Sequence, residues 1–309
     1  MVISLKKILY CLIFITFLLI SIHYQENLII IKKGLTIYFE VLFPNMFISM
    51  VLIYLLYYVG FFTSLKYPFL TKLLNMNHQA IGFSLTCILL GFPLASVLID
   101  ETYNQHLLTK KQALRLFYCI HISKLSFIVN QCGMLLFHNL KLAFLLYFVQ
   151  LFSIIILLFL TRHTSIHLTT LTNKPFSTSL NLAFIQSITS LFYIGGYYLM
   201  ILCIYEIANL YLPSFITSIL AFLLEISNGI ILLQNSAITI PLLFIITSIY
   251  LMFASFSIHL QIFSMITYLK VSYFTFIKYR LLHLFIIILL CMIIAIFFSY
   301  DFLFDYANK

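Results

Sequence analysis

The stretch that most constrains this chain runs from Leu90 to Phe137, where polar and charged residues interrupt a sequence that is otherwise apolar. Polar groups at membrane depth cost free energy, so they mark a cavity or a pathway more often than a structural accident. Gly91-Phe92-Pro93 breaks an apolar run, because Pro93 has no backbone N–H and disfavours a helical Phe92. The alternative is a proline kink within one spanning helix. Thr109 and Gln112 form a capping box, which predicts one long helix over Lys110–Phe137.

The composition predicts an all-α polytopic membrane protein. Hydrophobic residues make up 63% of the chain and charged residues 8%, and the mean hydropathy is +1.12. Soluble domains contain roughly 45–50% apolar residues. The net charge of +9 comes from cations at the ends of apolar segments. This pattern fits membrane orientation and argues against nucleic acid as a partner.

The sequence predicts no cofactor and no metal site. The six cysteines lie in apolar runs without a C-x-x-C pair, so they indicate neither disulfides nor thiolate ligands. His163 and His167 have the spacing of a metal pair, but no third ligand is near them in the sequence. The expected partners are the lipid bilayer of the cell membrane and an unknown small solute, together with a coupling ion if transport uses one.

The apolar runs predict about seven spanning helices and two broken, re-entrant segments. An N-terminal unit (1–33) precedes a first repeat (34–160), a cytoplasmic linker (161–179) and a second repeat with the last span (180–309). The expected spans are Ile8–Ile22, Leu42–Phe62, Lys110–Phe137, Leu142–Leu160, Leu180–Leu210, Pro241–Leu269 and Leu281–Phe298, and the broken segments are Gln79–Tyr103 and Phe215–Asn235.

The two halves resemble each other in the order of their elements. LLGFPLASVLIDETY in the first half parallels LLEISNGIILLQNSA in the second, which is typical of a repeated transporter unit. If both broken segments enter and leave on the same side, the basic residues gather in the cytoplasm, whereas full crossings split them evenly. The charge pattern therefore favours re-entrant hairpins in an inverted repeat. The cations then expected inside are Lys6, Lys7, Lys66, Lys72, Lys110, Lys111, Arg115, Arg162, Lys174, Lys270, Lys278 and Arg280.

Several polar residues of the expected long helix recur at near-helical spacing, so most of them would share one broad face. The simpler alternative is hydrogen bonding between helices, which is common for intramembrane Ser, Asn and Gln but a weak explanation for an intramembrane lysine. The candidate binding residues among them are His121, Ser123, Lys124 and Asn130, with Gln131 beside them.

The second half supplies the remaining candidates. Glu225 and Asn228 are predicted either to ligate a cation or solute hydroxyl, or to cap the second break. Inverted repeats bring equivalent elements together, so Gly91-Phe92-Pro93 and Ser227-Asn228-Gly229 are expected near each other at mid-bilayer. The predicted lining is Ser123, Lys124, Glu225 and Gln261, with Lys124 and Glu225 as charge partners. His259 and Gln261 would face one cavity only if their helix were also broken.

Residues of both halves carry a resemblance to a known family. The stretch from Leu89 to Phe137 resembles the core of the YlbJ sporulation integral membrane protein family, within the group with nucleoside-recognition gate domains. The resemblance extends from about Gly34 to His283. The matching residues are Gly91, Pro93, Leu107, Thr109, Ala113, Arg115, Leu116, Ser123, Phe127, Ile128, Gly133 and Phe137, then Ile194-Gly195-Gly196, Leu224-Glu225-Ile226, Gly229, Ser257, Gln261 and Arg280-Leu281-Leu282-His283.

The chain departs from the family pattern at Val97, Lys124-Leu125, Asn130 and Ala254-Ser255. The resemblance implies a role in forming the spore cortex, in the membrane around the forespore, by moving a small solute that is nucleoside-like by analogy. The full set of expected binding residues is Gly91, Pro93, His121, Ser123, Lys124, Asn130, Glu225, Asn228, Ser257 and Gln261. The alternatives are an assembly factor without transport and a membrane transferase. Against an enzyme, Asp100-Glu101 is the only acidic pair, and adjacent helical residues do not converge as an acid and base would.

Overall fold

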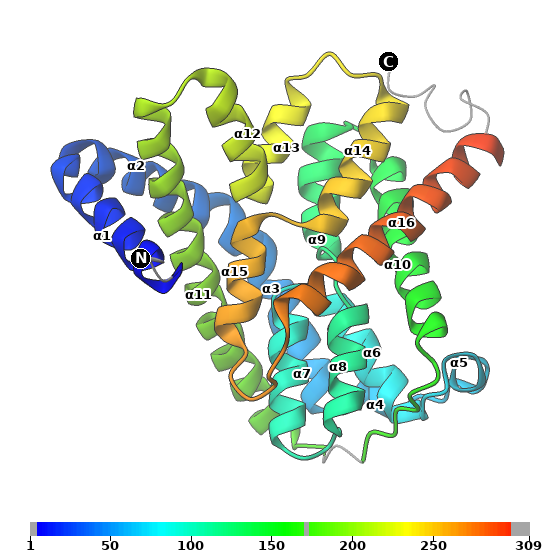
Figure 1. Cartoon of the computed structure of the whole chain (residues 1–309). Coiled ribbons are helices and arrows are strands. Elements are labelled where there is room, and N and C mark those ends of the chain that lie inside the picture. Colours follow the sequence, from blue (N-terminus) through cyan, green and yellow to red (C-terminus); the bar gives the residue numbers. More distant parts are fainter. Residues whose placement is uncertain (1–4, 170–172, 298–309) are drawn as a thin grey trace.

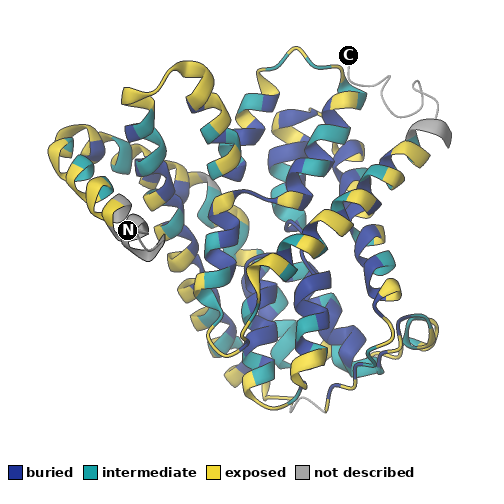
Figure 2. Ribbon diagram, viewed as in Figure 1, coloured by how far each residue is buried: buried dark blue, intermediate teal, exposed yellow. Residues whose placement is uncertain are grey.

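The computed structural model describes residues 5–169 and 173–297 (Figure 1). Within these residues the chain is helical and forms no β-strand, apart from one isolated bridge between Met76 and Ile166. Buried residues concentrate where the central helices meet, while most of the described side chains of α1 (Leu5–Ile22) and α2 (Tyr24–Ile37) are exposed or half-buried (Figure 2). The predicted all-α class is therefore confirmed.

The first half of the chain contains ten α-helices and two π-helical segments among the described residues. They are α1 (Leu5–Ile22), α2 (Tyr24–Ile37), η1 (Tyr38–Leu42), α3 (Phe43–Tyr58), α4 (Phe61–Ser64), α5 (Pro68–Leu74), α6 (His78–Leu90), α7 (Leu94–Asn104), α8 (Lys110–Cys119), α9 (Leu125–Phe127), η2 (Ile128–Leu136) and α10 (Leu140–Leu160).

The second half has fewer and longer elements. They are α11 (Phe176–Tyr211), α12 (Ser214–Leu224), α13 (Ile226–Gln234), α14 (Ile240–Phe253), α15 (Phe256–Met265) and α16 (Tyr273–Phe297). In Figure 1, α6, α7 and α8 lie in the lower half of the molecule, and α12, α13 and α14 lie in the upper half. Each of α6 and α12 packs against the helix that follows it.

Four helical segments of the described residues are long and apolar enough to cross a membrane. They are Leu140–Leu160, Phe176–Tyr211, Ile240–Met265 and Tyr273–Ile294. A fifth is possible if the bent pair Phe14–Ile22 and Tyr24–Glu40, whose axes differ by 94°, counts as one span. Lengths near twenty apolar residues match the hydrocarbon core of a bilayer. The chain is thus a helical membrane protein.

Several expected elements differ in their bounds. The span expected at Leu42–Phe62 ends at Tyr58, because Gly60 adopts a left-handed conformation with φ of +76° and separates α3 from the short α4. α11 begins at Phe176, inside the expected linker, and runs through Gly195-Gly196 without a break. α16 begins at Tyr273, earlier than expected.

The predicted capping box of α8 is confirmed. Gln112 N–H donates to Thr109 Oγ1 at 3.4 Å, and Thr109 N–H donates to Gln112 Oε1 at 2.9 Å. Arg115, one helical turn further on, is buried and donates to the carbonyls of Leu74 and Leu158 at 2.8 and 2.7 Å. These carbonyls belong to the last turns of α5 and α10, where helical carbonyls have no partner within the helix, so the guanidinium helps to satisfy both helix ends.

A second buried charge joins the two halves. The Asp100 carboxylate on α7 accepts hydrogen bonds from the backbone N–H groups of Thr267, Tyr268 and Leu269, in the connection between α15 and α16. The Thr267 hydroxyl adds a contact at 3.4 Å. We call this arrangement the Asp100 clamp. Asp100 is only 2% exposed, and its charge is balanced by backbone dipoles rather than by a cation.

Candidate functional site: a cavity between four helix breaks

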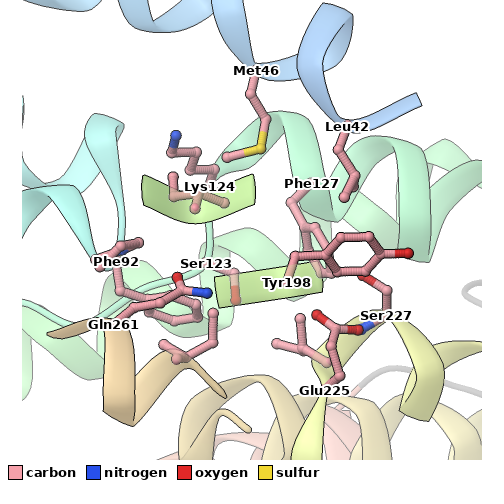
Figure 3. A pocket seen from close by; sticks show the side chains of 14 residues that line it. Leu42, Met46, Phe92, Ser123, Lys124, Phe127, Tyr198, Glu225, Ser227 and Gln261 are labelled. Atoms are coloured by element: carbon pink, nitrogen blue, oxygen red, sulfur yellow. The ribbon is translucent and has the colours of Figure 1, made fainter. Parts of the chain in front are cut away.

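Four interruptions of helices face one cavity of about 70 Å³. They lie between α6 and α7, α8 and α9, α12 and α13, and α14 and α15. Residues at or soon after each break line the cavity together with residues of η1, α3 and α11 (Figure 3). The lining residues of this central cavity are Leu42, Met46, Phe92, Pro93, Ser123, Lys124, Phe127, Ile194, Tyr198, Glu225, Ile226, Ser227, Ile258 and Gln261.

The first break falls at Gly91-Phe92-Pro93, as predicted. Gly91 has a φ of +65°, and a Cβ there would lie 2.9 Å from the Ile122 carbonyl oxygen, so this position needs glycine. The Phe92 N–H donates to the same carbonyl at 3.0 Å. The break between α6 and α7 is therefore joined by a hydrogen bond to the backbone near Lys124.

The second break is one that the sequence interpretation missed. The single long helix predicted over Lys110–Phe137 is wrong, because α8 ends at Cys119 and the residues from Ile120 to Lys124 are not helical. The Ile122 carbonyl within this stretch accepts a hydrogen bond from the Phe92 N–H instead of continuing a helix. The β-branched Ile120 and Ile122 are the local signal that was available, since such residues have reduced helix propensity.

As a consequence, the expected polar face of this helix does not exist. Ser123 and Lys124 line the central cavity. His121 is buried instead among aromatic rings, with ring centroids 5.3 Å from Phe117 and 5.0 Å from Phe276. Asn130 lies in η2 and is not among the lining residues.

The third break occurs at Glu225 rather than at Ser227-Asn228-Gly229. Glu225 has an extended backbone, and its carboxylate accepts the N–H groups of Ser227 and Asn228 in the first turn of α13. A carboxylate at a helix N-terminus satisfies donors that have no partner within the helix. The Tyr250 hydroxyl bonds to the carbonyls of Phe222 and Glu225 at 2.8 and 3.1 Å. The break is therefore capped on both sides.

The fourth break, at Ala254-Ser255, was not predicted as such. Ala254 has a φ of +64°, which is rare for a residue with a side chain. His259 Nε2 lies 2.9 Å from the Phe253 carbonyl oxygen at the end of α14. Gln261 lines the central cavity, whereas His259 borders a separate apolar cavity beside Tyr273. The two residues therefore face different cavities although their helix is broken.

Three lining residues of the central cavity carry a buried polar atom without a hydrogen-bond partner, as do several buried residues elsewhere in the described chain. Lys124 is only 5% exposed, and its Nζ has no hydrogen-bond partner among the described residues. The Ser123 hydroxyl and Gln261 Oε1 are also buried without a partner there. Gln261 Nε2 donates to the Ser257 hydroxyl, one helical turn earlier on α15, at 3.3 Å. Buried polar atoms are normally satisfied, so this cluster requires an explanation.

The predicted ion pair between Lys124 and Glu225 is absent. The one ion pair within the described residues joins His23 and Glu26, at 3.8 Å. Lys124 and Glu225 lie on opposite sides of the central cavity (Figure 3). The cap of α13 already provides donors for Glu225, which removes its need for a cation. Lys124 has no comparable arrangement.

Five of the ten candidate binding residues line the central cavity, namely Pro93, Ser123, Lys124, Glu225 and Gln261. Gly91, Asn228 and Ser257 contact members of this group without appearing in the lining. His121 and Asn130 lie elsewhere. The sequence interpretation did not single out Tyr198 or Phe92 as binding residues, although Tyr198 follows Ile194 by one helical turn on the same face of α11.

No group of three or more His, Cys, Asp or Glu side chains is placed to hold a metal ion in the residues that the structure describes. Comparisons with protein-family models, with curated proteins and with solved structures found no match for this chain.

Proposed function

We propose that this protein is a transporter whose two halves form an inverted repeat around the central cavity. Each half begins with a helix that lines the cavity (α3, or the longer α11), followed by a hairpin broken at its tip, a broken crossing and a final helix (α10 or α16). The hairpins α6–α7 and α12–α13 lie at opposite ends of the molecule (Figure 1). This order is typical of transporters with a midplane site. Counting α1, α3 and the broken α8–η2 as crossings gives the seven expected spans.

The observation that carries the proposal is the unpaired ammonium of Lys124. A buried amine without a counter-ion costs several kcal/mol (about 2.5–3.5 at a bilayer centre), a cost that function explains better than folding does. The helices that begin at the breaks also direct their N-termini, the positive ends of their dipoles, toward the same region. Only α13 has a carboxylate in place there, that of Glu225.

This electrostatic arrangement favours a solute with an acidic group. The acid would bind Lys124 and the uncapped N–H groups at the start of α9, and its neutral part would meet Ser123 and Gln261. A cavity of about 70 Å³ has room for a few water molecules. Solute binding therefore requires the breaks to separate from α3 and α11, which is the kind of movement that alternating access uses.

The test is uptake by the purified protein in liposomes. A panel of labelled small organic acids and nucleosides is compared for the natural chain, for Lys124→Met and for Lys141→Gln at the far end of α10 as the control. We expect saturable uptake of an acid that Lys124→Met abolishes and Lys141→Gln preserves. If the protein takes up a nucleoside and Lys124→Met does not change that uptake, the proposal of an acidic solute is wrong, whereas the proposal of a transporter stands.

The alternatives predict other results. A folded protein that neither binds nor moves any solute of the panel would favour an assembly factor. A transferase is disfavoured because Asp100 is engaged by three backbone N–H groups, and Glu101 accepts from Gln186 at 3.3 Å. The proposed role in the spore cortex rests on the family resemblance alone, and deletion in a spore-forming host followed by cortex measurement tests it.

A further inference from the structure

A hollow with a basic lining lies at the lower end of α10, away from the central cavity. It has a volume of about 610 Å³ and is formed by the ends of α5 and α10 and by residues that follow each of these helices. We call it the basic hollow, and its lining is Thr71, Lys72, Asn75, Phe159, Leu160, Arg162 and His163.

The charges of the basic hollow are not balanced by acidic residues. Lys72, Arg162 and His163 are all exposed at its surface. The chain has no Asp or Glu between Glu40 and Asp100, or between Glu101 and Glu206, so the two segments that form the hollow contain none. No ion pair involves these three residues within the described chain. The hollow therefore presents two cations and an imidazole to an anionic ligand.

The floor of the basic hollow is held in place. Asn75 Nδ2 donates to the Arg162 carbonyl at 3.0 Å, and the Ile166 N–H donates to the Asn75 carbonyl at 3.1 Å. The Arg162 guanidinium lies 4.4 Å from the centre of the Phe159 ring. A guanidinium above an aromatic face is stabilised by the ring quadrupole and keeps its N–H groups available at its edge.

An apolar stripe on α10 leads directly from the basic hollow. Phe148 and Phe152 are 53% and 58% exposed, and Phe144 and Phe159 are exposed on the same helix. At 100° per residue, these four positions fall within one narrow face of the helix. α10 is one of the segments that can cross a membrane, so this face meets lipid chains, and Phe159 belongs to both the stripe and the hollow.

We propose that the basic hollow binds the headgroup of one anionic phospholipid, whose acyl chain lies along the phenylalanine stripe of α10. The headgroup phosphate contacts Lys72 and Arg162, with His163 at the rim. A lipid fits better than a soluble phosphate because the same site continues into a membrane-facing aromatic surface. The excess of cations at this end of the molecule is the pattern expected on the cytoplasmic side, where anionic lipids are recognised by basic pockets between helices.

The experiment measures lipids retained by the full chain in nanodiscs of phosphatidylcholine and phosphatidylglycerol, using native mass spectrometry. We expect the natural chain to retain phosphatidylglycerol preferentially. Removing two cations with Lys72→Gln/Arg162→Gln should weaken this retention roughly thirty-fold, at about 1 kcal/mol for each charge. The matched control is Lys66→Gln/Lys111→Gln, which removes two exposed lysines outside the hollow.

Further arms separate the headgroup, the chain and folding. Arg162→Lys keeps the charge and should keep most of the retention, whereas Phe148→Ala/Phe152→Ala should weaken it with the hollow intact. If the control double variant loses as much phosphatidylglycerol retention, general surface charge explains the retention and the proposal is overturned. Full displacement of the lipid by inorganic phosphate, with no effect of the phenylalanine variants, would identify a soluble anion site instead. Size-exclusion profiles check that each variant is folded.

Discussion

The Asp100 clamp and the central cavity each contain a buried charged residue, but only the residue in the clamp is hydrogen-bonded within the fold. Asp100 is surrounded by three backbone N–H groups and a hydroxyl, so its desolvation is compensated within the fold. Lys124 is nearly as buried, yet its amine has no partner in the described chain. Hydrogen bonds to a buried charge offset its desolvation cost, whereas a buried charge without partners keeps that cost. The comparison therefore separates a charge whose hydrogen bonds are made within the fold from one whose hydrogen bonds are not, and we propose that a solute supplies the latter.

The largest effect is expected at the clamp. Asp100→Ala leaves three N–H groups of the connection between α15 and α16 without an acceptor, which should lower the free energy of unfolding by about 4 kcal/mol. Asp100→Asn keeps one acceptor oxygen and should lose less. Thermal unfolding in detergent, followed by fluorescence, measures the change.

The adjacent Glu101 provides the control for the clamp. Glu101→Gln replaces a carboxylate whose one recorded hydrogen bond is with Gln186, so its effect on unfolding should stay within about 0.5 kcal/mol. Similar losses for Asp100→Ala and Glu101→Gln would show that the hydrogen-bond arrangement around Asp100 is not what stabilises this region.

The second effect has the opposite sign. Lys124→Met fills a similar volume without the charge, so it should raise the free energy of unfolding by up to about 2.5 kcal/mol while abolishing uptake. The same unfolding assay and the liposome assay test the two parts separately. Loss of stability in Lys124→Met would mean that the amine has a structural partner, and the contrast with Asp100 would fail.

A smaller loss of stability is expected at the break between α12 and α13, where the Tyr250 hydroxyl forms neutral hydrogen bonds. Tyr250→Phe removes the hydroxyl that bonds to the carbonyls of Phe222 and Glu225, which should cost about 1.5 kcal/mol. Tyr147→Phe on α10 is the control, because no hydrogen bond of that hydroxyl is recorded in the described chain, and its change should stay below about 0.5 kcal/mol. A Tyr250→Phe protein as stable as this control would leave the break at Glu225 without its expected support.

The breaks show how far local sequence predicts the site. The break at Gly91-Phe92-Pro93 was predicted because proline removes a backbone donor whatever surrounds it. The break at Glu225 was anticipated within its segment, but its position was not, since the preference of a carboxylate for the N-cap competes with several nearby polar residues. The break from Ile120 to Lys124 has neither Gly nor Pro, and it was missed.

The sequence by itself determined the membrane class, the helical fold and the ends of helices that carry their own caps, such as Thr109 with Gln112. These properties follow from side-chain hydropathy and from hydrogen bonds between residues three or four apart, which the order of residues fixes. Only the tertiary structure decided that Ile122 is not helical and that its carbonyl accepts from the Phe92 N–H. It also decided that the Asp100 carboxylate is bound by the backbone of Thr267–Leu269. In the same way, it decided that Lys124 and Glu225 do not form an ion pair. Each of these depends on groups distant in the chain, whose proximity no local pattern specifies.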